Sequence, residues 1–423
     1  MALTIILIFV SKLDFNLRLI KDELAVMQKI TATRTQWHHI IIIICIGIST
    51  AFYIGKVPPA LPFIRSELEM DLVTAGWVIS IFNALGTIIG IAVGLLADRI
   101  GPGRVITVSL IILPLASVMG SFSGSVEILL CSRLLEGLGY ASIFVAGPAL
   151  IALMVSEKER AAAVSLWSST TPIGMTLAVV LAPILLEPFG WRSLWIGTAL
   201  FSLGIFAIFQ RTIVPELRPI PKRTVTPWRH VKTTVTKLGP CLLAIAFMTY
   251  TFQWMAIMVW LPTFVMEERE LKIGIAAILA ATAIAVNIPG NWFGSWLVHK
   301  GMARWTIITI GSSAMGISSL LIFSDSFPDN FRYGMILVFS FLGGLQPAAL
   351  ISGTTFHTPT PAQLGATNGL LYQGSQCGQF FGPPAIAIIV TTTGVWETAG
   401  VLLFALTLIN ITIAIAIRYL ELA

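Results

Sequence analysis

The chain has 423 residues, of which 56% are hydrophobic and 11% charged, and its mean hydropathy is +0.89. Soluble domains carry about 25% charged residues, so this composition excludes a soluble globular protein and indicates many membrane spans of roughly 20 apolar residues each. The apolar runs are continuous rather than alternating, which disfavours a transmembrane barrel. The net charge of +6 comes without a separate basic domain, so no nucleic-acid partner is expected.

Twelve apolar runs predict an all-α membrane protein with twelve transmembrane helices. The runs cover residues 38–62, 73–96, 105–123, 126–150, 161–186, 193–210, 240–265, 273–297, 305–323, 334–354, 369–391 and 400–418. If the N-terminus is cytoplasmic, 19 of the 26 Lys and Arg residues fall on the cytoplasmic side and 5 outside. Because cytoplasmic loops are enriched in Lys and Arg, we expect a multi-pass protein of the cytoplasmic (inner) membrane with both termini in the cytoplasm.

Residues 1–37 precede the first run and are predicted to form an N-terminal cytoplasmic segment. Met1–Val10 is apolar but too short to span a membrane, and a signal peptide carries its charges before the apolar run rather than after it. Met27 begins a conventional short tail that leads into Trp37. We therefore interpret Met27 as the start of translation and expect residues 1–26 to be absent from the protein.

Lys56 lies inside the first apolar run, within Gly55–Pro62. Three prolines in this stretch interrupt helical hydrogen bonding, which a membrane tolerates where neighbours or a cavity satisfy the freed groups. A charge at this depth is costly unless it reaches the interface or faces water or a partner. Two interpretations stay open: Lys56 snorkels to the outer interface, or it belongs to a functional site.

A charged hairpin is expected between the second and third runs. It contains Gly94, Asp98, Arg99, Gly101 and Arg104. Two stripes of glycine at four-residue spacing also occur in the spans, and such stripes let helix backbones approach closely. We expect both stripes to line an interface between two halves of the protein; they are Gly86, Gly90 and Gly94 in the second run, and Gly374, Gly378 and Gly382 in the eleventh.

The fourth run holds Arg133 and Glu136, three residues apart and so on one helix face. The two side chains are expected to form an ion pair within the membrane, and an Arg in a span usually faces the bundle interior. Glu136 is the only acid that we place within a span. The pair is either structural or functional.

The second half of the chain repeats the first at an offset of about 200 residues. Leu61, Pro62, Gly94, Gly101 and Arg104 recur as Leu261, Pro262, Gly294, Gly301 and Arg304. This repeat predicts two pseudo-symmetric six-helix halves, residues 38–211 and 240–418, joined by a cytoplasmic linker over 212–239 and followed by a cytoplasmic tail over 419–423.

Polar residues gather in the spans of the second half. Each alone could be a hydrogen-bonding contact between helices, but together they predict a polar cavity wall without acidic groups. The substrate-binding candidates there are Gln253, Trp254, Asn287, Asn291, Gln346, Tyr372 and Gln376. The four cysteines lie in apolar stretches without metal-ligand spacing, and no nucleotide-binding loop occurs, so no metal or cofactor is expected.

The stretch from Gly94 to Arg104 resembles the loop between the second and third spans of the major facilitator superfamily, G-x-x-x-D-R-x-G-x-x-(R/K). The resemblance covers about residues 38–418. It implies a twelve-helix fold, transport by alternating access and no enzymatic activity. It also implies that Gly94, Asp98, Arg99, Gly101 and Arg104 form a conformational latch that closes the cytoplasmic side, and that they do not bind the substrate. The second copy has Val298 in place of the carboxylate.

The fourth run resembles the family pattern R-x-x-Q-G-x-G, with Glu136 in place of the usual Gln. The resemblance links Arg133 to proton coupling or substrate charge, and Glu136 would hold Arg133 in place or carry the proton itself. The stretch Gly55–Pro62 looks like the cyanate-permease-like branch, whose members carry small anions or other small solutes. The antiporter pattern of the fifth span, G-x-x-x-G-P-x-x-G-G, does not occur in this chain.

Lys56 and Arg133 against Glu136 would give a cavity with net positive charge, which suits an anion. We therefore predict a secondary active transporter that moves a small anion with protons across the bilayer and works as a monomer. One alternative is a proton-coupled exporter of neutral or cationic drug-like compounds. Another is a non-transporting membrane sensor, which would need an output domain that neither terminus nor the central loop is long enough to supply.

Overall fold

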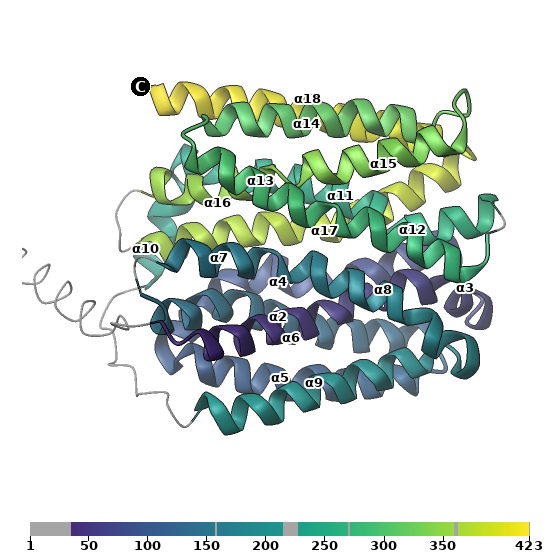
Figure 1. The fold of residues 1–423 in the computed structure, drawn as a ribbon, viewed down its shortest axis with the longest axis horizontal. Coiled ribbons are helices and arrows are strands. Elements are labelled where there is room, and N and C mark those ends of the chain that lie inside the picture. The colour runs from purple at the N-terminus through teal and green to yellow at the C-terminus, as the bar shows by residue number, and fades with distance from the viewer. Residues whose placement is uncertain (1–34, 157–158, 215–226, 270, 359–362, 423) are drawn as a thin grey trace, which may run out of the picture.

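The computed structural model describes residues 35–156, 159–214, 227–269, 271–358 and 363–422 (Figure 1). Within these residues the chain forms helices and contains no strand. The helices of the first half are α2 (Trp37–Gly55), α3 (Val57–Glu67), α4 (Leu72–Ile100), α5 (Pro102–Ser121), α6 (Val126–Met154), α7 (Arg160–Ser168), α8 (Thr170–Phe189) and α9 (Arg192–Thr212). The expected start at Met27 lies outside the described residues.

A short helix, α10 (Pro227–Val235), lies in the expected linker and precedes the second half. The rest of that linker, over 215–226, is outside the described residues. The helices of the second half are α11 (Leu238–Arg269), α12 (Ile273–Ala285), α13 (Asn287–His299), α14 (Arg304–Ile322), α15 (Asp329–Gly343), α16 (Gln346–His357), α17 (Leu364–Thr393) and α18 (Glu397–Leu422).

Eleven helical stretches of the described chain are long and apolar enough to cross a membrane. The 30-residue α17 is not among them, and it carries Gln373, Gln376 and Gln379 in place of apolar residues. The count of twelve spans therefore stays a prediction that depends on α17. Large aliphatic side chains such as Ile88, Leu115 and Ile184 point outward, and each is more than 60% exposed. A lipid-facing surface accounts for them, so the chain is a multi-pass, all-α membrane protein.

Four of the spans are divided into two helices, and each division precedes a proline. The divisions fall at Lys56, Ser169, Val286 and Leu345. Proline follows two or three residues later in each case, as Pro58, Pro172, Pro289 and Pro347. Because proline has no N–H to donate, it is tolerated at a helix start and breaks the ladder of hydrogen bonds before it. The first span therefore bends at Lys56 and continues as α3.

The two halves pack against each other reciprocally. The second span of the first half, α4, packs along α17, which is the fifth span of the second half. The fifth span of the first half, α7 with α8, packs on the second span of the second half, where α8 contacts α12. Figure 1 shows α4 and α17 side by side in the middle of the molecule. This exchange is what a pseudo-two-fold relation between the halves requires.

The described parts of both termini lie at one end of the bundle (Figure 1). At this end Gln36 N donates to Met154 O over 3.2 Å, and Arg304 pairs with Glu421 over 2.9 Å. The opposite end carries other ion pairs, among them Arg192 with Glu67 at 2.6 Å. The shared end agrees with the expected topology, and its cytoplasmic location stays a prediction.

The expected hairpin after the second run is shorter than the sequence suggested. α4 continues to Ile100, and α5 begins at Pro102, so the turn consists of Gly101 alone. Gly101 has φ of +94°, a conformation that favours glycine. Nothing between Leu95 and Ile100 breaks a helix, which is why Gly94, Asp98 and Arg99 belong to the last turns of α4.

The glycine stripe of α17 does not line the interface between the halves, so that expectation is wrong. Gly374, Gly378 and Gly382 pack on the backbone of α11 within the second half; a Cβ at Gly382 would lie 2.7 Å from Phe252 O. Since α17 is packed against both α4 and α11, its small residues face the neighbour whose backbone comes closest. This contact binds α17 firmly to its own half.

The glycines of α4 divide between two neighbours. Gly86 and Gly90 face α17, where a Cβ would lie 2.8 Å from Gln376 Cγ and 2.9 Å from Gln373 Cγ, respectively. These two lie at the interface between the halves, as expected. Gly94 instead faces Val145 of α6, at 3.6 Å, within the first half. A four-residue spacing drifts around a helix of 3.6 residues per turn, which carries Gly94 away from α17.

We expect Gly378→Ala to lower the melting temperature of the purified protein. The added methyl group would overlap Met248 O and the Thr251 hydroxyl, and overpacking of this kind costs about 1–3 kcal/mol. The matched control is Gly204→Ala, because a Cβ there meets nothing within 4 Å among the described atoms. Equal melting temperatures for the two variants would show that α17 is not held to α11 by close backbone contact.

Candidate functional site

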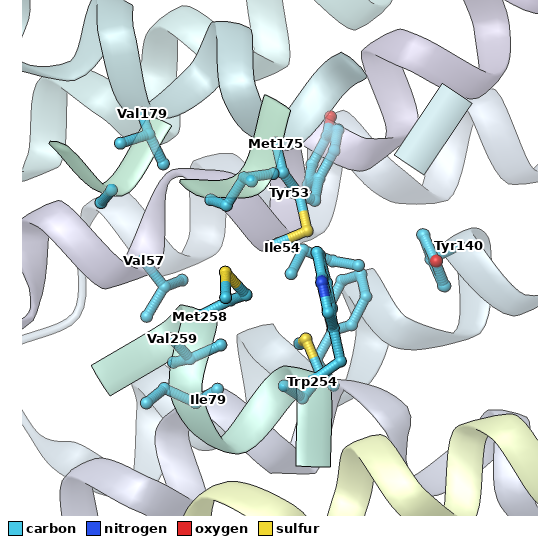
Figure 2. Packing of buried hydrophobic residues seen from close by; sticks show 14 of the residues in the cluster. Tyr53, Ile54, Val57, Ile79, Tyr140, Met175, Val179, Trp254, Met258 and Val259 are labelled. Atoms are coloured by element: carbon cyan, nitrogen blue, oxygen red, sulfur yellow. The ribbon is translucent and has the colours of Figure 1, made fainter. Parts of the chain in front are cut away.

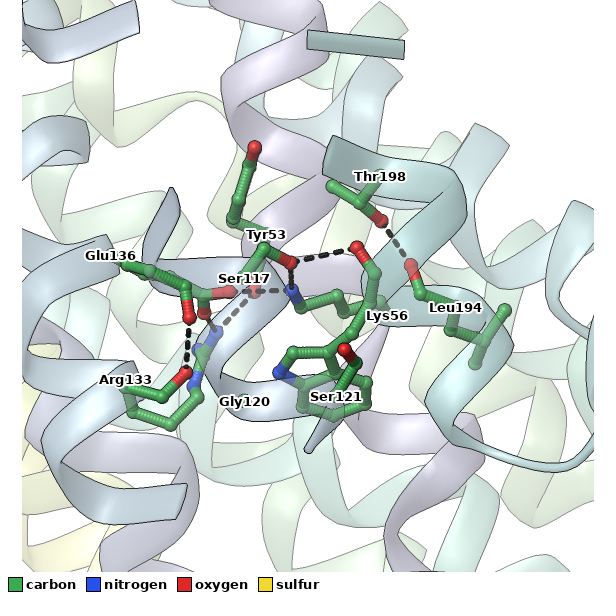
Figure 3. A network of polar contacts seen from close by, with 12 residues as sticks. Tyr53, Lys56, Ser117, Gly120, Ser121, Arg133, Glu136, Leu194 and Thr198 are labelled. Atoms are coloured by element: carbon green, nitrogen blue, oxygen red, sulfur yellow. Dashed lines mark hydrogen bonds and ion pairs between the residues drawn. The ribbon is translucent and has the colours of Figure 1, made fainter. Parts of the chain in front are cut away.

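Three charged side chains meet inside the first half, and Figure 3 shows their contacts. Lys56 Nζ lies 2.6 Å from Glu136 Oε1, and Arg133 Nη1 pairs with the other carboxylate oxygen, Oε2. The side chains of Lys56, Arg133 and Glu136 are 2%, 1% and 0% exposed. We call these three residues the charge cluster. A single buried carboxylate therefore bridges two cations.

The bend of the first span places Lys56 in this cluster. α2 ends at Gly55, and Pro58 and Pro59 begin α3, so Lys56 leaves the helix at the bend. Its Nζ also donates to Ser117 Oγ of α5 over 2.8 Å. Ser117 in turn donates to Trp195 O of α9 over 2.8 Å. Helices α2, α5, α6 and α9 are thus joined through one ammonium group.

Arg133 ties the cluster to α2 and α4. Its guanidinium donates to Tyr53 O over 2.7 Å and to Val78 O over 3.4 Å. Its Cζ lies 4.4 Å from the centre of the Phe82 ring. Lys56 Nζ lies 4.4 Å from the centre of the Trp195 ring. Aromatic faces of this kind stabilise desolvated cations by about 2 kcal/mol.

The charge cluster carries more positive than negative charge. Two cations share one carboxylate, and Glu136 is the only carboxylate among the buried residues that the structure describes. The other buried arginine, Arg332, pairs with Asp325 at 3.0 Å. Charges inside a membrane are costly unless they are paired, so a surplus cation in a span points to an anionic ligand or to proton transfer.

Two expectations about this region are resolved. Lys56 does not snorkel to the outer interface, because its ammonium group is buried against Glu136 and Ser117. The expected ion pair between Arg133 and Glu136 is present. The sequence did not single out Ser117, Trp195 or Phe82, since a serine or an aromatic residue in a span carries no signal until the fold shows what it contacts.

Two of the polar candidates of the second half point away from the first half. Gln253 Oε1 accepts a hydrogen bond from Thr407 of α18 over 3.0 Å. Gln346 Oε1 accepts one from Asn410 of α18 over 2.9 Å. Both carboxamides are thus engaged in contacts between helices of the same half. Their role in substrate binding stays a prediction.

Asn287 and Asn291 hold the division between α12 and α13. Asn287 Nδ2 donates to Ser340 O of α15 over 2.9 Å, and Asn291 Nδ2 donates to Asn287 Oδ1 over 2.9 Å. Trp254 Nε1 donates to Ser340 Oγ over 3.3 Å. These side chains therefore fix α15 to its neighbours.

Trp254 also belongs to an apolar layer between the two halves (Figure 2). Met258 and Val259 of α11 lie beside it, and Val57, Ile79, Met175 and Val179 of the first half face them. All of these residues are buried. The layer closes the centre of the molecule with side chains from both halves.

Tyr372 and Gln376 lie where α17 meets α4. A Cβ at Gly90 would lie 3.2 Å from Tyr372 Cδ1, and one at Gly86 would lie 2.9 Å from Gln376 Oε1. These two candidates, unlike Gln253 and Gln346, therefore reach the interface between the halves.

The expected latch residues lie at the end that carries both described termini. Arg99 and Arg104 are exposed, in the last turn of α4 and the first turn of α5, and Gly101 is the turn between them. The side chain of Asp98 is outside the described residues. The latch role of this motif stays a prediction.

Comparison with known proteins decides the family. Residues 40–360 match the family model of the Major Facilitator Superfamily. The chain belongs to the major facilitator superfamily. Members of this superfamily are membrane transporters and not enzymes, so a small-molecule solute and the lipid bilayer are its partners. The predicted fold class, two helical halves in one membrane protein, is confirmed.

Several named transporters are similar to this superfamily chain. The putative niacin/nicotinamide transporter NiaP of Bacillus subtilis is 23% identical, over 80% of this chain and 84% of the relative. The probable sulfoacetate transporter SauU of Cupriavidus necator is 25% identical, over 68% of this chain and 73% of the relative. The cis,cis-muconate transport protein of Acinetobacter baylyi is 23% identical, over 78% of this chain and 81% of the relative.

A solved structure has the same fold. It is the crystal structure of a bacterial homologue of the human lysosomal transporter Spinster, in an inward-facing and unoccupied conformation. The TM-score is 0.68 at 16% sequence identity, with 91% of this chain and 95% of that chain covered. At this identity the likeness concerns the fold alone.

We expect Glu136→Ala to destabilise the protein more than Lys56→Met. The first change leaves two buried cations without a counter-charge, which costs about 3–5 kcal/mol. The second leaves Glu136 paired with Arg133 and keeps an apolar chain of similar length. Melting temperatures of the purified variants measure the difference, with the exposed Glu187→Ala as a control for removal of a carboxylate. A larger loss in Lys56→Met would contradict a cluster organised around Glu136.

Proposed function

We propose that this transporter moves a small organic anion together with a proton, by alternating access. The observation that carries the proposal is the surplus positive charge of the buried charge cluster. The similar proteins named for sulfoacetate and cis,cis-muconate are named for anions, which supports the same class of solute here. Each chain holds one cluster and both halves, so we propose that a single chain is the transport unit.

Competition for the two cations couples the anion to the proton. The carboxylate of Glu136 pairs with both Lys56 and Arg133 in the described structure. The carboxylate of a bound solute would need the same hydrogen-bond donors. Protonation of Glu136 removes its negative charge and releases the cations for the anion. Because a monovalent anion then replaces the charge that Glu136 lost, the net charge of the buried site stays the same. A binding step that changed the buried charge would be costly in this environment.

The packing of the two halves supplies the surface for alternating access. The halves meet along α4 with α17 and α8 with α12, and the apolar layer around Trp254 and Met258 lies between them. Rocking of one half against the other about a central site would expose that site to each side in turn. The charge cluster belongs entirely to the first half, so it would move as part of one rigid bundle.

Proteoliposome uptake tests anion transport. We expect radiolabelled organic acids, among them nicotinate, sulfoacetate, benzoate and 4-hydroxybenzoate, to include one that accumulates when an inward proton gradient is imposed. Lys56→Met should abolish this uptake because it removes one of the two cations. The matched control is Lys300→Met, since Lys300 is exposed at the end of α13. Uptake of none of these acids by folded wild-type protein would contradict anion transport.

The pH profile tests the role of Glu136. Initial uptake by wild-type protein should rise as the external pH falls, because only the protonated carboxyl releases the cations. Glu136→Gln mimics the protonated form, so its uptake should be independent of pH and should follow the anion gradient alone. The anion should also raise the melting temperature of Glu136→Gln more than that of wild type, since no carboxylate competes. A wild-type pH profile in this variant would show that the proton binds elsewhere.

A further inference from the structure

Five buried polar atoms on helices α4 and α17, which pack along each other, have no hydrogen-bond partner among the described residues. They are Ser80 Oγ, both amide atoms of Asn83, Gln376 Oε1 and Tyr372 Oη. The side chains of Asn83 and Gln376 are each 1% exposed. Buried polar atoms in native proteins nearly always have a partner, and in a membrane no bulk water can supply one. A group of five on one helix pair therefore indicates a site for a ligand.

The packing of the two helices brings Gln376 and Tyr372 against α4. α4 and α17 run antiparallel, since Gly76 lies against Pro384 at one end and Ile91 lies against Gly369 at the other. Glycines at 86 and 90 let Gln376 and Tyr372 lie directly on the backbone of α4. Asn83 precedes Gly86 by three residues, so its amide lies one turn away on a neighbouring part of the same face.

The same turns of α4 also contact the charge cluster. Arg133 reaches Val78 O and the ring of Phe82, which directly precedes Asn83. Ile79, one turn from Asn83, belongs to the apolar layer between the halves (Figure 2). Arg133 of the charge cluster and the amide of Asn83 thus adjoin one stretch of α4.

We infer that Asn83, Gln376 and Tyr372 form a second recognition site for the transported anion. The site binds a neutral group that both donates and accepts hydrogen bonds, a hydroxyl or a carboxamide, at the end of the solute opposite its acid group. This assignment rests on the proposed anion transport and narrows its substrate to hydroxy- or carbamoyl-carboxylates.

The hydrogen-bonding groups of Asn83, Gln376 and Tyr372 determine this class of substrate, a carboxylate with a neutral polar group. The amide of Asn83 offers a donor and an acceptor, Gln376 Oε1 offers an acceptor, and the phenol of Tyr372 offers either. No lysine or arginine is among them, so they do not complement a second acid group. An inorganic anion such as cyanate has no distal group to satisfy them. A small acid with one neutral polar end satisfies both the cations and the amides.

Stability is the first test of this site, and it needs no ligand. Asn83→Leu and Gln376→Met replace the unpartnered amides by apolar groups of similar size, so both variants should melt at a higher temperature than wild type. The matched control is Asn287→Leu, which should melt lower because Asn287 donates to Ser340 O over 2.9 Å. Lower melting temperatures for Asn83→Leu and Gln376→Met would show that these amides have structural partners and would overturn the proposal.

Selectivity is the second test. Proteoliposome uptake is compared within two pairs, 4-hydroxybenzoate with benzoate and glycolate with acetate. Wild type should prefer the hydroxylated acid of at least one pair by about tenfold or more, because the unhydroxylated acid leaves the buried amides unpaired. Asn83→Leu should lose that preference and retain uptake of the unhydroxylated acid.

The outcomes separate this proposal from the one on which it rests. Uptake without a hydroxyl preference in wild type, or a preference that survives in both Asn83→Leu and Gln376→Met, overturns the second recognition site alone. Uptake of none of the four acids by folded wild type overturns anion transport and the site together. Lys56→Met should lose uptake of both members of each pair, which distinguishes the acid-binding end from the neutral end.

Discussion

A carboxylate held between two cations, in a medium that does not solvate charge, is the interaction on which the first half depends. Glu136 joins Lys56 of the bent first span to Arg133 of α6, and Ser117 extends the contact to α5 and α9. Without the carboxylate, two buried cations would repel each other in a low dielectric. The contact therefore stabilises the bundle. Because its net charge is positive, the same residues are also suited to bind an anion.

Helix α4 connects this cluster to the other half of the protein. One of its faces receives Arg133 at Val78 O, and another packs along α17 through Gly86 and Gly90. α17 is in turn bound to α11 by close contact at Gly378. α4 is thus bound to the first half and α17 to the second, and Gln376 and Tyr372 of α17 lie against α4. A rearrangement of the charge cluster would therefore act on the interface between the halves through α4.

Much of the fold could be predicted from the sequence because the membrane constrains it so strongly. Each span needs a continuous apolar run, so the runs gave nearly all of the helices, and a charge inside a run singled out Lys56, Arg133 and Glu136. The expectation for the glycines of α17 was wrong because spacing shows that a helix has a smooth face and not which neighbour covers it. Gln253 and Gln346 were candidates because polar residues gather in the spans of the second half, and only the structure shows that both contact α18. The likeness to the cyanate-permease-like branch stays a prediction.

The sequence by itself determined that this is a membrane protein of two helical halves with charged residues inside the first, since burial of apolar runs and the cost of buried charge depend on composition and position alone. Transport was implied by the resemblance of one loop to a known superfamily. Only the tertiary structure decided that Lys56 shares Glu136 with Arg133, because the two cations lie 77 positions apart in the sequence and meet through the bend of the first span at Lys56. It also decided that both amide atoms of Asn83 are buried without a hydrogen-bond partner among the described residues. Hydrogen-bond partners depend on the packing of distant helices, and no local pattern records them.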